Sequence, residues 1–120
     1  MLRLFVAIFC FFINPSAHGQ DFVLAVGESR VLAEYHELRG CQPLAAPRLQ
    51  LTRGPALGRA TFMGAETTLA AGGCAPLRVS VTRVVYRAEQ PGQDHIAWSV
   101  RYQGRGRAPQ HDAVRIQIRP

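Results

Sequence analysis

The chain has 120 residues, a length typical of a single domain rather than of a multidomain protein. Its 14 basic residues are all arginine and outnumber the 8 acidic ones, which gives a net charge of +6. This excess favours an acidic partner.

The N-terminus has the layout of a secretory signal peptide. A short basic start precedes the apolar run of residues 4–13, which is shorter than the about 20 residues that a membrane-spanning helix needs. The apolar run is then interrupted, and the small residues Ala17 and Gly19 follow, as at a signal-peptide cleavage site. We therefore predict that residues 1–19 are removed and that residues 20–120 form the mature domain. The mature protein would be periplasmic or secreted and would not span a membrane.

Removal of this segment would take Cys10 away and leave Cys41 and Cys74. Two cysteines in an exported chain most simply form one disulfide. The alternative is a metal thiolate pair or a reactive thiol, but neither cysteine has a histidine or a second cysteine close by in the sequence. We predict a structural disulfide, worth about 3–4 kcal/mol in the chain-entropy model.

The mature chain consists of short segments in which apolar and polar residues alternate, separated by Gly and Pro turns. Such alternation is typical of strands with one buried face. The predicted strands cover residues 22–26, 30–35, 48–53, 59–63, 77–81, 84–88, 96–102 and 114–118. A short helix over residues 32–38 is the alternative for the second strand, and residues 66–71 are ambiguous.

Two local irregularities are expected. The alternation changes phase between Val81 and Val84, so we predict a bulge or a bend near Val81-Thr82. Residues 104–109 contain two glycines and a proline and are predicted to form a mobile hairpin loop. About seven short strands in a mature chain of roughly 100 residues indicate an all-β sandwich.

The C-terminal half resembles a known family. Its pattern consists of Tyr86, then Gly92-Gln93-Asp94-His95-Ile96-Ala97-Trp98-Ser99-Val100, then Val114-Arg115-Ile116-Gln117-Ile118. This resembles the end of bacterial Ig-like (cadherin-like) domains, and Pro55-Ala56-Leu57-Gly58 resembles the turn that opens an inner strand of the same domains. The two cysteines resemble those of small solitary exported proteins of this type. The resemblance covers residues 48–118 and implies a single Ig-like β-sandwich.

The chain departs from the family pattern at two points. Arg87-Ala88 replaces the usual Thr-Pro, and the following corner is short and lacks an aromatic residue. Calcium-binding cadherin repeats also need acidic clusters between successive domains, whereas Asp21, Asp94 and Asp112 are isolated. No calcium site is therefore expected.

Four residues of the pattern have expected structural roles. Tyr86 is predicted to be a corner tyrosine, with a buried ring and a hydroxyl that reaches a backbone partner. Asp94 is expected to accept backbone N–H bonds at a turn; a catalytic role would need a second acid or a base, and Glu89 is the only carboxylate close by. Ile96 and Trp98 are predicted to be core residues, with a ligand-stacking platform as the alternative for Trp98.

No catalytic site, metal site or cofactor is predicted. His36, His95 and His111 occupy separate segments without the spacing of metal ligands. Serine is scarce in the mature chain, and no Gly-x-Ser-x-Gly motif is present. We therefore predict that the protein is not an enzyme.

If the alternating apolar residues face inward, a set of arginines faces outward from three strands that the resemblance makes neighbours. They are Arg83, Arg87, Arg101, Arg115 and Arg119, with Arg105 and Arg107 at the rim. The set is either a plain solvated surface or an anion-binding face for acidic envelope lipid, glycan or protein, and nucleic acid is not expected. The expected function is a non-catalytic, monomeric exported module that acts by binding or structural association in the cell envelope. The alternative is a periplasmic carrier of a small molecule or metal.

Overall fold

The computed structural model describes residues 20–70 and 72–120, so the predicted signal peptide, residues 1–19, lies outside the described residues. The described part is built of nine strands, and it contains no helix long and apolar enough to cross a membrane. The predicted all-β class is confirmed. The strands are β1 (Gln20–Ala25), β2 (Ser29–Tyr35), β3 (Leu38–Arg39), β4 (Gln42–Pro43), β5 (Arg48–Arg53), β6 (Gly58–Leu69), β7 (Leu77–Ala88), β8 (Gly92–Arg101) and β9 (Gln110–Arg119).

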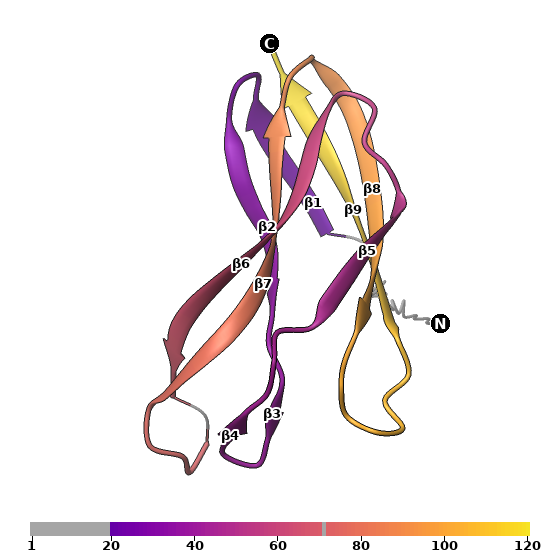
Figure 1. Ribbon diagram of the computed structural model, residues 1–120. Coiled ribbons are helices and arrows are strands. Elements are labelled where there is room, and N and C mark those ends of the chain that lie inside the picture. The colour runs from indigo at the N-terminus through magenta and orange to yellow at the C-terminus, as the bar shows by residue number, and fades with distance from the viewer. Residues whose placement is uncertain (1–19, 71) are drawn as a thin grey trace, which may run out of the picture.

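The strands form two larger sheets and one short hairpin (Figure 1). One sheet has the order β1-β9-β8-β5, and the other has the order β2-β7-β6. Strands β1 and β9 run parallel, and the other pairs in these sheets are antiparallel. The seven strands of the larger sheets account for all eight predicted ranges, because residues 77–81 and 84–88 belong to the single strand β7. The count of nine includes β3 and β4, a hairpin of two-residue strands in a segment that was expected to be loop.

The described residues of the two ambiguous segments lie mostly in strands. Residues 32–38 do not form the alternative helix, because β2 continues to Tyr35 and β3 begins at Leu38. Strand β6 extends to Leu69 and pairs with β7 over its whole length. Along residues 66–69, exposed and half-buried positions alternate but none is fully buried, so the backbone bonds to β7 are the main contacts that hold this part of the strand.

The bulge expected near Val81-Thr82 is in a different place. Strand β7 pairs with β6 without a register shift, and the shift occurs on β2, between Val31 and Ala33. Burial on β7 does change phase, because Val81 and Val84 are both fully buried. Val84 belongs to the main core cluster, whereas Val81 lies outside it. Strand β7 also contacts β4. One long strand therefore buries opposite faces at its two ends.

The inward side chains of both larger sheets form one hydrophobic core. Every second residue is buried on β8 from Asp94 to Val100 and on β9 from Val114 to Ile118, as the alternation predicted. The core cluster consists of Leu24, Leu32, Val84, Tyr86, Ala88, Ile96, Trp98, Val100, Val114, Ile116 and Ile118. Trp98 is only 1% exposed, so its predicted place in the core is confirmed, as is that of Ile96.

Cys41 and Cys74 form the predicted disulfide. Cys41 lies between β3 and β4, and Cys74 lies between β6 and β7. The bond therefore ties the short hairpin to the connection between the two longest strands, at the end of the molecule drawn at the bottom of Figure 1.

We expect reduction of this disulfide to lower the free energy of unfolding by about 2–3 kcal/mol. The bond closes a loop with a sequence separation of 33, but it joins two peripheral elements that contribute nothing to the main core cluster. Urea unfolding of the protein with and without reductant measures the difference. Thiol labelling of the unreduced, denatured protein should find neither cysteine free, and an unfolding midpoint unmoved by reductant would contradict the stabilising role.

Candidate anion-binding face

The structure separates the five arginines that were predicted to share one surface. Arg83 and Arg87 lie on β7 in the three-stranded sheet, whereas Arg101, Arg115 and Arg119 lie on β8 and β9 in the four-stranded sheet. The prediction of a single arginine face across these three strands is therefore wrong. Alternation along a strand distinguishes the inner from the outer face, but it does not show which of two sheets the strand joins.

The outer surface of the four-stranded sheet carries a different set of arginines, which we call the basic face. It comprises Arg48, Arg53, Arg101, Arg115 and Arg119, all of them exposed. Arg48 and Arg53 were not among the residues predicted to form this surface. Arg48 could have been found, because it precedes the alternating Leu49 and Leu51 and has the outward phase.

Arg53 reaches this face through a β-bulge. Leu51 pairs with Trp98, but Arg53 pairs with Ala97, so Thr52 is an extra residue in β5. In a regular strand, Arg53 would share the inward phase of Leu51. The extra residue reverses that phase and turns Arg53 to the outer side, as bulges commonly do.

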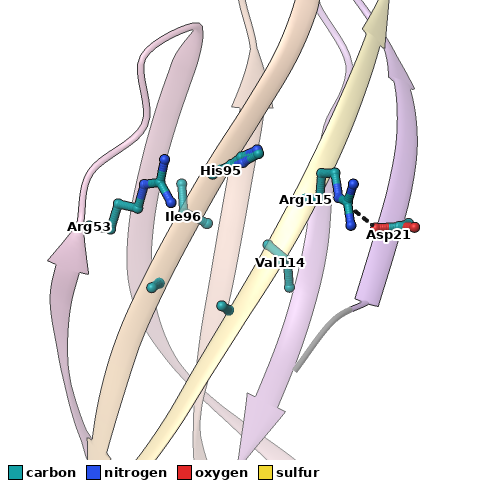
Figure 2. A pocket seen from close by; sticks show the side chains of 8 residues that line it. Asp21, Arg53, His95, Ile96, Val114 and Arg115 are labelled. Atoms are coloured by element: carbon teal, nitrogen blue, oxygen red, sulfur yellow. Dashed lines mark ion pairs between the residues drawn. The ribbon is translucent and has the colours of Figure 1, made fainter. Parts of the chain in front are cut away.

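Arg53 borders a shallow hollow of about 230 Å³ in the middle of the sheet (Figure 2). The small side chains of Ala97 and Ala113, which are paired across β8 and β9, leave this space open. His95 and Arg115 are also direct cross-strand neighbours and border the hollow on the side of β1. Three nitrogen-rich side chains from three strands thus surround a floor of small apolar groups.

The two sheets differ in how their arginines are neutralised. On the three-stranded sheet, ion pairs join Arg83 to Glu34 at 2.6 Å, Arg78 to Glu66 at 3.1 Å and Arg59 to Glu89 at 3.6 Å. On the basic face, the described residues supply one ion pair, between Arg115 and Asp21 at 3.3 Å. The other four arginines of the basic face have no carboxylate of the described chain within ion-pair distance.

Asp94 is a structural carboxylate in the core. It is 3% exposed and accepts hydrogen bonds from the backbone N–H groups of Ala56 (2.8 Å) and Leu57 (2.9 Å) and from the Tyr86 hydroxyl. Tyr86 is buried as predicted, but its partner is this carboxylate rather than the backbone. A Cβ on Gly58 would collide with the Tyr86 ring, which explains the glycine in this turn.

These contacts also determine the ionisation states of Asp94 and Tyr86. Burial by itself raises the pKa of Asp94, but the hydrogen bonds from Tyr86, Ala56, Leu57 and His95 outweigh burial and hold the pKa below its usual value. Burial and the adjacent Asp94 carboxylate raise the pKa of the Tyr86 hydroxyl. Asp94 therefore stays ionised and Tyr86 stays protonated. Their polar atoms are hydrogen-bonded to each other and to the backbone of the turn.

Glu37 is a second buried carboxylate, and its burial was not predicted from the sequence. It is 3% exposed and accepts hydrogen bonds from the backbone N–H groups of Gln103 (2.7 Å) and Gly104 (2.8 Å). The Arg107 guanidinium lies 4.0 Å from Glu37 and 3.8 Å from the centre of the Tyr102 ring. The loop between β8 and β9, which was predicted to be mobile, is thus anchored at its beginning.

Trp98 has a polar partner in addition to its core contacts. Its indole Nε1–H donates to the Tyr35 hydroxyl at 2.9 Å, and the Tyr35 hydroxyl donates to the Asp112 carboxylate. Burial and this hydrogen bond to Asp112 raise the pKa of Tyr35. The chain of bonds links β2, β8 and β9 and explains how a buried indole N–H is satisfied.

The described part of the chain contains no group of three or more His, Cys, Asp or Glu side chains that could hold a metal ion. The three histidines do not form one cluster: His95 lies at the hollow of the basic face, whereas His36 and His111 do not border it.

No family model and no curated protein matches this chain. The comparison with solved structures found the solution structure of amebosin, at 11% sequence identity over 85% of this chain and 98% of that chain, with a TM-score of 0.37. A likeness of this size supports no conclusion about fold or function.

Proposed function

We propose that this protein is a non-catalytic exported module with an Ig-like β-sandwich fold, and that its basic face binds acidic material of the cell envelope. The observation that carries the proposal is the unequal neutralisation of the two sheets. On the three-stranded sheet the chain supplies carboxylates to four of five arginines, namely Arg30, Arg59, Arg78 and Arg83, and Arg87 has no ion pair. The five arginines of the basic face share one carboxylate, that of Asp21. An external anion would supply the missing charge.

The connectivity supports the Ig-like part of the proposal. If β2, β7 and β6 are taken as strands B, E and D, and β5, β8 and β9 as C, F and G, the sheet partners agree with those of an Ig-like sandwich. The first strand differs from the constant-type arrangement, because β1 pairs with β9 rather than with β2. The hydrogen bond from Tyr86 to Asp94 links the end of strand E to the start of strand F, but it differs from the corner tyrosine of Ig domains, which lies on strand F and bonds to the backbone.

Export and the absence of catalysis have separate support. The disulfide is typical of oxidising compartments, and the signal-like N-terminus of the sequence agrees with export. The two buried carboxylates, Asp94 and Glu37, are both engaged by backbone N–H donors and are thus explained as structural groups. Neither is left free to act as an acid or a base.

Replacement of Arg53, Arg115 and Arg119 by Gln tests the basic face. We expect this triple variant to lose most of its retention on anionic vesicles and on an acidic polysaccharide at low salt, because opposite charges attract most strongly where screening is weak. Wild-type retention should fall as salt rises. Melting should change little, since exposed ion pairs contribute about 0–1 kcal/mol each.

The matched control replaces Arg59, Arg83 and Arg87 on the three-stranded sheet by Gln. It removes the same number of charges from arginines that include two with carboxylate partners. The control should retain most of the binding. Equal retention of the wild type and both variants, on the anionic vesicles and on the acidic polysaccharide alike, would reject an anion-binding face.

A further inference from the structure

Arg48 and Arg101 are directly opposite each other across β5 and β8. Like charges in this position repel and destabilise a sheet. Both arginines are exposed on the basic face, and together they border two hollows at this end of the sheet. No described carboxylate lies within ion-pair distance of either one.

One other pair of directly opposed arginines is present, and there the chain provides a carboxylate. Arg59 is opposite Arg87, and Glu89 lies 3.6 Å from Arg59. His95 is opposite Arg115, and Asp21 lies 3.3 Å from Arg115. The Arg48–Arg101 pair is the exception among the described cross-strand pairs of basic residues. A carboxylate from a ligand would neutralise Arg48 and Arg101, as Glu89 and Asp21 neutralise Arg59 and Arg115.

The surface between this pair and the hollow beside Arg53 carries polar side chains. Arg101 and His95 are six residues apart on β8, which corresponds to about 20 Å along an extended strand. Gln50 and Ser99 are paired between them and offer polar groups to a ligand. Val23, on the edge strand β1, is the one large exposed apolar side chain among the residues that border the hollows of this face. The face therefore has no group of apolar residues that could insert into a bilayer.

We propose that the basic face binds a linear acidic polysaccharide, with one carboxylate of the polymer held between Arg48 and Arg101. The polymer runs along β8 and places a further carboxylate beside Arg53. Guanidinium groups bind carboxylates through paired, charge-assisted hydrogen bonds, so two of them facing each other suit a uronic acid group. This inference rests on the proposed function and narrows its ligand from acidic envelope material in general to an acidic glycan.

The experiment measures the affinity of the mature protein for polygalacturonate by calorimetry. Replacement of Arg48 and Arg101 by Gln should weaken binding at least about tenfold, the size expected for loss of hydrogen bonds to a charged group. The matched control, with Arg59 and Arg87 replaced by Gln, removes the other directly opposed arginine pair and should stay within about threefold of wild type. Melting curves check that both variants are folded.

Ligands of different length and chemistry provide further tests of the site. Oligomers long enough to reach both subsites should bind more tightly than galacturonate monomer, whereas neutral dextran should not bind. Equal weakening in the two double variants, or no gain with length, would overturn the polysaccharide site but leave general anion binding intact. Binding to vesicles rich in phosphatidylglycerol without binding to polygalacturonate would also overturn it. Binding to neither probe would reject the proposed function as well.

Discussion

Replacement of Trp98 by Ala should lower the free energy of unfolding by about 3–5 kcal/mol. Trp98 is 1% exposed and is the largest fully buried side chain of the core. Truncation leaves a cavity between the sheets and takes from the Tyr35 hydroxyl its indole donor. A small domain typically has about 5–15 kcal/mol of stability in total, so the variant should be partly unfolded at moderate temperature.

Circular dichroism is the suitable probe for this variant, because Trp98 is the single tryptophan of the sequence and its fluorescence is lost with it. Trp98→Phe serves as the matched control. It keeps an aromatic ring in the core but loses the hydrogen bond to Tyr35, so we expect a smaller cost than that of the alanine variant. Melting of Trp98→Ala close to that of wild type would mean that the ring is not a core residue.

Replacement of Asp94 by Ala should also cost about 3–5 kcal/mol. Its carboxylate accepts the backbone N–H groups of Ala56 and Leu57 and the hydroxyl of Tyr86, and each buried donor left without an acceptor costs about 1–3 kcal/mol. Urea unfolding at pH 7 measures the loss. Asp21→Asn is the control, because the exposed Asp21 forms a surface ion pair with Arg115 and should contribute at most about 1 kcal/mol.

The contribution of Asp94 should depend on pH in a defined direction. Its folded-state pKa is lowered, whereas an aspartate in an unfolded chain titrates near pH 3.9. A lowered pKa stabilises the fold above that pH, and the stabilisation is lost as the pH falls through the folded-state pKa. The difference in stability between wild type and Asp94→Asn should therefore be constant near neutral pH and shrink below about pH 4. A difference that did not shrink in acid would contradict an ionised Asp94.

Much of the fold could be predicted from the sequence because it depends on local patterns. Alternation in residues 84–88, 96–102 and 114–118 identified strands with one buried face, and it placed Trp98 and Ile96 in the core. Two cysteines remaining after an apparent signal peptide were enough to predict the disulfide. These inferences succeed because side-chain period and cysteine number reflect burial and oxidation directly.

The candidate site was only partly predictable, because it depends on which strands become neighbours. Arg101, Arg115 and Arg119 were correctly separated from the core residues, but Arg83 and Arg87 were assigned to the same surface although β7 belongs to the other sheet. Nothing in the alternation of a strand specifies its neighbours, since any outward arginine has the same phase on either sheet.

Only the tertiary structure decided the remaining features. The bulge in β5 turns Arg53 outward against its sequence phase, and the register of β5 with β8 sets Arg48 opposite Arg101. Glu37 has no motif around it, and its role follows from two backbone N–H groups that lie more than 60 residues further along the chain. Register and long-range hydrogen bonds arise from the packing of the whole chain, so they cannot be deduced from the residues on either side of a position.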